Sequence, residues 1–297
     1  MQTLKAYIDL TRIQFFFVWP LLFLSGLFLS FQVYGGFDWL LVAKAAAIAL
    51  LGFEAGFVLN DIVDRDHDAK DVEHDKLTKY WRVFGGRPLP TGRVSLRGAY
   101  ILFAVFAVAA TALILTLPSP HSYWVLAIMA YSYIVEVFYQ FRKRGQRLPL
   151  AQLIGRTDFS LFPVAGYLVN GQPDLIPLLY FLFFYPYAQA HLGMNDLIDV
   201  ANDEARGMAT PATLYGLNGT KIWILSFTVL HFIGAVFFTS VLRPAAVIGV
   251  GVGLLLLLIA NMAVQKKATP ESALKVLPLF HAAMLVYTAS IILSHFL

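Results

Sequence analysis

Long apolar runs alternate with short polar connections along the whole chain. About nine of these runs are long enough to cross the roughly 30 Å hydrocarbon layer of a membrane as helices. The pattern therefore predicts an all-α polytopic membrane protein with about nine transmembrane helices in one bundle. The expected spans cover residues 10–31, 38–59, 98–117, 121–141, 151–169, 174–192, 220–241, 245–264 and 275–296.

The amino-acid composition supports this assignment. Hydrophobic residues make up 59% of the 297 residues and charged residues 13%, whereas soluble domains average about 25% charged residues. The first apolar run is longer than a signal-peptide core and has no small-x-small cleavage site, so we expect it to be retained as a span. The chain has no cysteine, which excludes disulfides, thiolate metal sites and cysteine nucleophiles.

Basic residues gather in every second connection between the spans. Cytoplasmic loops carry an excess of Lys and Arg, so the alternation predicts a cytoplasmic N-terminus and a C-terminus outside the cell membrane. The opposite loops contain Arg243 as their basic residue. The net charge of +4 reflects this orientation and gives no reason to invoke nucleic acid, and no obligatory protein partner is evident.

An acidic signature, N-D-x-x-D-x-x-x-D, occurs twice, at the cytoplasmic ends of the second and sixth spans. At 100° per residue, the four polar side chains of each copy fall on one helix face. Hard oxygen ligands gathered in this way suit Mg²⁺, which a few carboxylates commonly hold together with substrate phosphates. The candidate metal ligands are Asn60, Asp61, Asp64 and Asp68 in the first copy and Asn195, Asp196, Asp199 and Asp203 in the second.

The two signatures lie four spans apart, as a duplication of a four-helix unit would produce. Because four is an even number, both copies keep the same orientation in the membrane. Parallel repeats are related by an axis along the membrane normal, which would place the signatures across one central cavity. We therefore predict a single transmembrane domain over residues 1–297, with two four-helix repeats and a ninth helix outside them.

Two connections are long, at about 60–97 and 193–219, and each directly follows an acidic signature. Both contain Gly, Pro and basic residues, as in FGGRPLPTGR at 84–93. Long loops in a compact domain are usually functional or disordered. Our hypothesis is that both loops cap the cavity on its cytoplasmic side, supply cations to the substrate and exclude water. Full activity after proteolytic cleavage in both loops would contradict it.

These features together resemble the UbiA superfamily of intramembrane prenyltransferases. The resemblance rests on NDIVDRDHD followed by GRPLPTGRVS and on the second acidic signature followed by RGMATPATLYG. The nine predicted spans and the basic FRKR segment after YSY at 131–133 add to it. It covers essentially the whole chain. In one respect the chain departs from the family, because the stretch between Asp68 and Arg87 is longer than usual.

The resemblance implies transfer of a polyprenyl group from its diphosphate to an acceptor, with release of pyrophosphate. The acceptor would be an aromatic quinone precursor or a lipid alcohol such as geranylgeranylglyceryl phosphate. The cofactor would be Mg²⁺, as two ions bridged by the substrate diphosphate. The catalytic residues would then be Asp64, Asp68, Asp199, Asp203 and Arg87, and the diphosphate would contact Asn60, Arg87, Arg142, Lys143 and Arg144.

Simpler explanations exist for some of these residues. An Asp at a helix end is often a cap or a solvated carboxylate, although duplication at equivalent helix ends argues for metal binding. The FRKR segment could equally anchor the cytoplasmic face on anionic lipid. His67 lies within the first signature, but its neighbours supply oxygen ligands that suit Mg²⁺, so we interpret it as a polar surface residue.

Ionisable residues inside the predicted spans form a second group. Charges within a membrane are costly and are functional candidates by default. A general base is needed to take the proton from an aromatic or hydroxyl acceptor, and the sequence does not select it. For Arg156 and Asp158, a mutual or interhelical salt bridge is an equal explanation. The candidates for an acceptor contact or the base are Glu54, Asp158 and His191.

A cation-coupled transporter with carboxylate ion sites is the alternative from another class of protein. Parallel repeats and intramembrane charges also describe transporters, but transporter sites lie near the bilayer midplane in broken helices. Here the acidic signatures lie at the cytoplasmic ends of the spans. A CDP-alcohol phosphotransferase fits less well, because neither signature continues through a D-G-x-x-A-R element.

Overall fold

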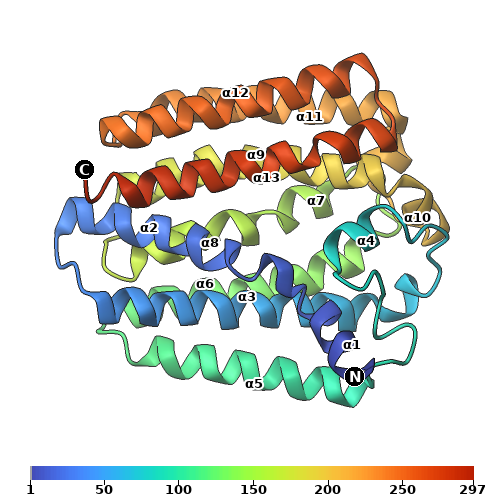
Figure 1. The fold of residues 1–297 in the computed structure, drawn as a ribbon, viewed down its shortest axis with the longest axis horizontal. Coiled ribbons are helices and arrows are strands. Elements are labelled where there is room, and N and C mark those ends of the chain that lie inside the picture. The colour runs from blue at the N-terminus through green and yellow to red at the C-terminus, as the bar shows by residue number, and fades with distance from the viewer. Residues whose placement is uncertain (1) are drawn as a thin grey trace.

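The computed structural model describes residues 2–297, which fold into helices packed side by side along one direction (Figure 1). The chain begins at the end that carries α1, α4 and α10, which we call the cap end, and finishes at the opposite end. The helices are α1 (Gln2–Leu10), the short η1 (Ile13–Phe15), α2 (Val18–Tyr34), α3 (Trp39–Asp68), α4 (Leu77–Trp81), α5 (Leu96–Leu115), α6 (His121–Arg142), α7 (Leu150–Gly155), α8 (Thr157–Leu168), α9 (Leu175–Ile198), α10 (Val200–Ala205), α11 (Pro211–Thr239), α12 (Pro244–Lys266) and α13 (Pro270–Leu293).

Eight helical segments within residues 2–297 are long and apolar enough to cross a membrane. They match eight of the predicted spans and confirm the all-α membrane fold. The prediction of one unbroken helix over 151–169 is wrong, because α7 ends at Gly155 and α8 begins at Thr157. Glycine is a weak helix former, and Gly155 lies so close to the ring of Tyr139 that a Cβ atom there would be 2.7 Å from it.

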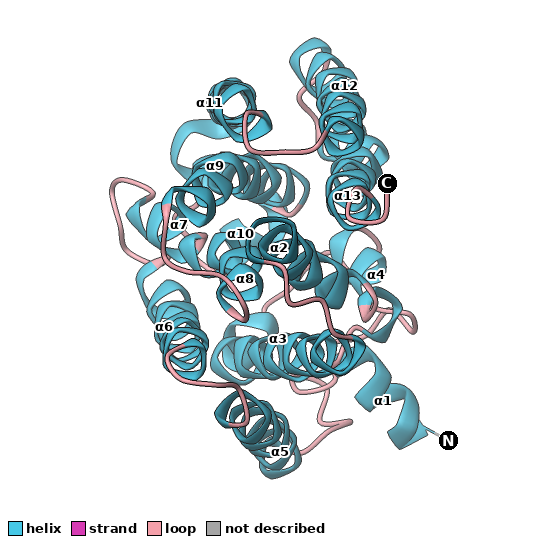
Figure 2. Cartoon of the chain, turned by 90° about the vertical axis from the view of Figure 1, so that its left-hand side faces the viewer, coloured by secondary structure: helices cyan, strands magenta, loops and turns pink. Residues whose placement is uncertain are grey.

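The two halves of the bundle are built from similar helix pairs. The helix α3 packs mainly on α5, and α9 packs mainly on α11. These pairs are equivalent under the four-helix offset predicted from the two signatures. In the end-on view of Figure 2, α3 and α9 lie on opposite sides of α2 and α8. The arrangement agrees with a duplicated unit, which stays a prediction.

Both acidic signatures are more helical than the sequence analysis expected. The helix α3 continues to Asp68, so the whole first signature is helical, and the second signature runs through the end of α9 into α10. The predicted cap loops at 60–97 and 193–219 therefore begin too early. A capping box between Thr210 and Thr213 also starts α11 earlier than the span predicted at 220–241.

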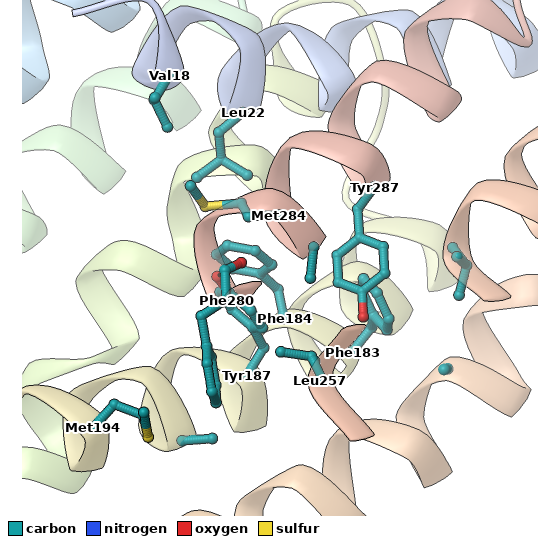
Figure 3. Close-up of a cluster of buried hydrophobic side chains, with 14 of the residues drawn as sticks. Val18, Leu22, Phe183, Phe184, Tyr187, Met194, Leu257, Phe280, Met284 and Tyr287 are labelled. Atoms are coloured by element: carbon teal, nitrogen blue, oxygen red, sulfur yellow. Dashed lines mark hydrogen bonds between the residues drawn. The ribbon is translucent and has the colours of Figure 1, made fainter. Parts of the chain in front are cut away.

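The helices α9 and α13 contribute many side chains to a hydrophobic core that also includes residues of α2, α8, α11 and α12. Figure 3 shows aromatic side chains of α9, including Phe183 and Tyr187, beside Phe280 and Tyr287 of α13. The rings of Phe183 and Tyr287 meet edge to face with centroids 5.1 Å apart. Such pairs add stability beyond the apolar area that they bury. The core thus holds α9, and with it the second signature, in a fixed position.

The helices α2 and α8 cross in close contact at two glycines. A Cβ atom at Gly166 would lie 1.8 Å from the carbonyl oxygen of Phe23, and one at Gly26 would lie 1.9 Å from the carbonyl oxygen of Pro163. Gly166→Ala should therefore force the helices apart and cost about 1–3 kcal/mol of stability. Thermal unfolding in detergent would measure the loss.

Gly251 is the matched control for this substitution. It lies on α12 and has nothing within 4 Å of the position that a Cβ atom would take. Gly251→Ala should leave the melting temperature unchanged or raise it slightly, because Ala in a helix is favoured over Gly by roughly 0.5–1 kcal/mol. Equal effects of the two substitutions would contradict the close crossing.

Candidate active site

Two cavities open side by side within the bundle and share several lining residues. The larger has a volume of about 230 Å³ and is lined mostly by apolar and aromatic side chains. The smaller has a volume of about 160 Å³ and is lined mostly by charged ones. The residues that line both are Arg12, Asn60, Trp81, Tyr139, Arg156 and Asn195.

The smaller cavity brings the two acidic signatures together. The helix α3 contributes one group of oxygens to it, and α9 and α10 contribute the other. These side chains lie far apart in the sequence, so the fold creates the cluster, as the predicted placement across one cavity requires. The predicted metal ligands that line it are Asn60, Asp64, Asp68, Asn195, Asp196, Asp199 and Asp203.

Asp61 is the predicted metal ligand that does not line either cavity. Its carboxylate accepts hydrogen bonds from Arg12 at 2.8 Å and from Arg82 at 2.8 Å, and its side chain is 3% exposed. This buried ion pair fixes the N-terminal segment and the first cap loop against α3. A metal-ligand role for Asp61 stays a prediction that this geometry does not favour.

Cations face most carboxylates of the smaller cavity. Asp64 pairs with Lys143 at 2.6 Å and with Arg144. Asp68 pairs with Arg87 at 2.5 Å. The FRKR segment divides at the end of α6, because Lys143 is buried in the cavity lining while Arg142 is exposed and lies outside it.

Arg206 joins both acidic signatures and was not selected from the sequence. Its guanidinium lies 3.6 Å from Asp68 and 3.6 Å from Asp199, and it also pairs with Asp71. Burial alone lowers the pKa of Arg206, but the surrounding carboxylates outweigh burial and raise it. Arg206 follows Asp203 by one helical turn, a spacing at which side chains are neighbours. That spacing is the feature of the sequence from which Arg206 could have been selected.

Burial also changes the protonation of the second signature. Together with the negative charge of Asp199, burial raises the pKa of Asp203 to about 7. Burial likewise raises the pKa of Asp199, although Arg206 opposes the change. At neutral pH the Asp203 carboxyl group is therefore partly protonated until a cation replaces the proton.

The oxygens of the smaller cavity fit a hard divalent cation. Three of them are buried without a hydrogen-bond partner among the described residues, namely Asp68 Oδ1, Asn195 Oδ1 and Asp196 Oδ2. No group of three His, Asp or Glu side chains within residues 2–297 is already assembled as a complete metal site. An incomplete set of protein ligands is compatible with Mg²⁺, because Mg²⁺ commonly binds one or two carboxylates and completes its coordination shell with phosphates and water.

Both cap loops contribute to the cavity and are tied to each other. Asn202 accepts hydrogen bonds from the backbone N–H of Val72 at 2.9 Å and of Glu73 at 2.8 Å. Asp9 of α1 accepts hydrogen bonds from the N–H of Phe84 at 2.7 Å and of Gly86 at 3.2 Å. These bonds hold the loop segment that carries Arg87 over the cavity.

The three candidates for an acceptor contact or general base differ in whether they line a cavity. Asp158 and His191 line the larger cavity, whereas Glu54 is buried and lines neither. Arg156 lines both cavities and makes no ion pair among the described residues, so the salt bridge to Asp158 that was considered as an alternative is absent from them. Asp158 instead accepts the backbone N–H of Phe159. Glu136, which the sequence analysis did not single out, lines the same cavity and accepts the side-chain amide N–H of Asn60 at 2.6 Å.

Comparison with known proteins identifies the family of this chain. A sequence model of the UbiA prenyltransferase family matches residues 17–284. The chain belongs to the UbiA prenyltransferase family. The predicted enzyme class is thereby confirmed, and the transporter alternative is set aside.

Curated UbiA relatives with assigned activities are about 30% identical to this chain. The 4-hydroxybenzoate octaprenyltransferase of Aeromonas salmonicida is 30% identical over 227 residues, which cover 73% of this chain and 70% of that protein. The same enzyme of Klebsiella pneumoniae is 32% identical over 199 residues, or 67% of this chain and 64% of that protein.

Solved UbiA structures share the fold over nearly the whole chain. The UbiA homolog from Aeropyrum pernix K1 has a TM-score of 0.75 at 20% identity and covers 94% of this chain and 97% of that one. The homolog from Archaeoglobus fulgidus bound to GPP and Mg²⁺ has a TM-score of 0.72 at 16% identity, with 97% and 99% covered. A digeranylgeranylglyceryl phosphate synthase structure has a TM-score of 0.70 at 19% identity, with 99% of both chains covered.

Proposed function

We propose that this UbiA prenyltransferase transfers a polyprenyl group from its diphosphate to an aromatic acceptor and releases pyrophosphate. The observation that carries the proposal is the pairing of two cavities: a charged one beside an apolar one, with Asn60 and Asn195 in the lining of both. The 4-hydroxybenzoate relatives favour an aromatic acceptor over a lipid alcohol.

The smaller cavity would bind the diphosphate. When bound, Mg²⁺ would neutralise the negative charge that develops on the leaving pyrophosphate. Asp64 and Asp68 on one side, and Asp196, Asp199 and Asp203 on the other, would hold it. The donor chemistry and the unpartnered buried oxygens support this assignment, as does the Archaeoglobus homolog bound to GPP and Mg²⁺.

Cations of the chain would act on the same oxygens. Lys143, Arg87 and Arg206 line the smaller cavity and already face its carboxylates. Preorganised donors of this kind stabilise developing charge without a cost of reorganisation at the moment of reaction. Arg142 is exposed and outside the cavity, so we expect it to contribute little to diphosphate binding.

The larger cavity would hold the prenyl chain and the reacting carbon. Its lining includes Trp19 stacked on Phe53 with ring centroids 4.0 Å apart, and Phe57 is edge-on to both. Such rings exclude water, which would otherwise capture an allylic cation, and their faces stabilise positive charge by roughly 0.5–2 kcal/mol each. The aromatic lining therefore suits an electrophilic prenyl group.

The test is pyrophosphate release by the purified protein in detergent. Geranylgeranyl diphosphate would be supplied with and without Mg²⁺, together with 4-hydroxybenzoate, a dihydroxynaphthoate or geranylgeranylglyceryl phosphate in turn. We expect Mg²⁺-dependent release that an aromatic acceptor accelerates. Acceleration by the glyceryl phosphate alone would replace the aromatic acceptor with a lipid alcohol. No release with any acceptor or prenyl length, from folded protein, would overturn the proposal.

The dependence on Mg²⁺ should change with pH. Because the pKa of Asp203 is raised to about 7, a proton competes with the metal below that pH, and metal binding releases it. The Mg²⁺ concentration for half-maximal activity should therefore fall as the pH rises from 6 to 8. Activity titrations at fixed ionic strength would measure it, and an unchanged or rising requirement would contradict this reading of Asp203.

The cap end should face the cytoplasm, as the distribution of basic residues predicts. The chain has no cysteine, so single cysteines report orientation cleanly. Lys70→Cys lies at the cap end and Gln172→Cys in the loop before α9, and both positions are exposed. In intact cells an impermeant maleimide should label Gln172→Cys and spare Lys70→Cys. The reverse pattern would invert the proposed orientation.

A further inference from the structure

The group that accepts the acceptor's proton was left open among three residues. Glu54 lines neither cavity. Asp158 lines the larger cavity, but its carboxylate already accepts the backbone N–H of Phe159 at the start of α8. Glu136 lines the same cavity and accepts the side-chain amide N–H of Asn60 at 2.6 Å, so it is committed to orienting Asn60. His191 remains, and its surroundings differ from those of the other two.

His191 is the first member of a hydrogen-bonded chain that leads from the larger cavity to the cap. Its Nε2 lies 2.9 Å from Nε2 of His281 on α13. His281 Nδ1 lies 2.7 Å from the hydroxyl oxygen of Tyr80 on α4. Tyr80 is partly exposed at the cap end, whereas His191 lines the cavity. Three helices distant in sequence therefore form one continuous polar path.

The atoms along this path can pass a proton in one direction. Two facing Nε2 atoms need one donor and one acceptor, since a neutral imidazole has one of each. With Nε2–H on His191 and Nδ1–H on His281, each group accepts on its cavity side and donates on its outer side. The Nδ1 atom of His191 makes no hydrogen bond with the described residues and is then the open acceptor toward the cavity.

Aromatic side chains surround the path and keep it dry. The ring of Tyr187 stacks on His191 with centroids 6.2 Å apart and an interplanar angle of 11°. The ring centroid of His281 lies 5.2 Å from that of Trp81 and 5.8 Å from that of Phe15. A hydronium ion would lose its hydration in these apolar surroundings at a high cost in free energy. The hydrogen-bonded groups are therefore the route for a proton between the cavity and the cap end.

The position of His191 also suits the reaction. It lies four residues before Asn195 on α9, so the two side chains are neighbours on one helix face, about one turn apart. Asn195 lines both cavities, and the diphosphate is proposed to bind beside it. The reacting carbon, attached to that diphosphate, would lie at the level of His191.

We propose that His191 is the general base of the transfer reaction and that His281 and Tyr80 carry the proton to the cytoplasmic side. The inference rests on the proposed function. His191 would be a catalytic residue, and His281 and Tyr80 would be positioning residues that act through it. A buried structural cluster is the alternative, and the test below distinguishes the two.

The proton balance of the step is complete. The bond between the allylic carbon and the diphosphate oxygen breaks, and pyrophosphate keeps the electron pair. A carbon or oxygen of the acceptor bonds to the allylic carbon and loses its proton to Nδ1 of His191. The Nε2 proton of His191 moves to His281, the Nδ1 proton of His281 moves to Tyr80, and the Tyr80 proton leaves to water.

The first experiment compares Tyr80→Phe with Tyr287→Phe. Tyr287 also bonds a buried histidine, since its hydroxyl lies 2.9 Å from Nε2 of His231, but it lines neither cavity. Both changes remove one Tyr–His hydrogen bond from the bundle. We expect Tyr80→Phe to lower kcat for acceptor prenylation at least about tenfold with unchanged KM for prenyl diphosphate, and Tyr287→Phe to retain the wild-type kcat.

The second experiment uses chemical rescue at His191. His191→Gly should lower product formation about 100-fold or more, the usual contribution of a general base. Added imidazole should restore part of it, whereas pyrrole, which has the same shape without a basic nitrogen, should not. Equal rescue by both compounds would mean that His191 only fills space.

The outcomes separate this inference from the proposed function. Wild-type protein that transfers no prenyl group would overturn both. Active wild-type protein with an unimpaired His191→Gly variant would overturn the base assignment alone. The relay through His281 would be overturned if His191→Gly lost activity while Tyr80→Phe kept the wild-type kcat and the wild-type solvent isotope effect on kcat.

Discussion

Asp64→Asn is expected to lower turnover at least about 100-fold while the helical bundle remains assembled. The substitution keeps the shape of the side chain but removes the charge that pairs with Lys143 and Arg144. Removal of one preorganised charge-stabilising group typically costs about 2.7–4 kcal/mol of barrier, and 1.36 kcal/mol corresponds to tenfold in rate. The loss of a proposed Mg²⁺ ligand should fall in this range or above it.

Asp66→Asn is the matched control for Asp64→Asn. Asp66 lies two residues further along α3, and its side chain is 76% exposed beside Arg65. The same chemical change there should leave the pyrophosphate release rate unaltered. Steady-state rates at saturating Mg²⁺ and prenyl diphosphate, with melting temperatures of both variants, complete the comparison. Full activity of folded Asp64→Asn would remove the first signature from the metal assignment.

The spans and the acidic cluster could be predicted from the sequence because both depend on local periodicity. An apolar run of about 20 residues has few alternatives to a membrane helix. The spacing of Asn60, Asp64 and Asp68 fixes their common face once the segment is helical. The duplicated signature then indicated that two such faces meet, and the smaller cavity contains residues from both.

Neighbours on one helix face were harder to separate. The sequence analysis treated Asp61 like Asn60, yet Asp61 is rotated by one residue from Asn60 and pairs with Arg12 and Arg82. The same limit applies at the end of α6, where Lys143 enters the cavity and Arg142 does not. A rotation of 100° per residue distinguishes such positions only when the direction of the cavity is known.

Contacts between distant segments left no signal in the sequence. Arg12 reaches Asp61 from the N-terminal segment, and His281 reaches His191 from the last helix. Neither Arg12 nor His281 belongs to a repeated sequence pattern. The helix break at Gly155 likewise depends on the ring of Tyr139, which comes from another helix. These features arise from packing, which periodicity along one chain does not encode.

Arg87→Ala is expected to reduce kcat/KM for prenyl diphosphate by about 100- to 1,000-fold, the equivalent of about 2.7–4 kcal/mol. The Arg87 guanidinium lies 2.5 Å from Asp68 and 2.5 Å from Asp71, and its side chain lines the smaller cavity with 14% exposure. It therefore supplies positive charge where the diphosphate is proposed to bind, and holds two carboxylates in place. Arg87→Lys should recover part of the loss, because it restores the charge without the planar fork.

Arg93→Ala is the control in the same cap loop. Arg93 is exposed, and its Nε donates to the hydroxyl of Thr91 at 3.1 Å, so it adds charge to the loop without lining either cavity. Initial rates at limiting prenyl diphosphate should be unchanged in Arg93→Ala and strongly reduced in Arg87→Ala. If both variants lost activity equally, the net charge of the loop, which draws the anionic substrate from solution, would explain the effect. If neither did, Arg87 would have no part in the reaction, and its two ion pairs would serve only to fix the loop on α3.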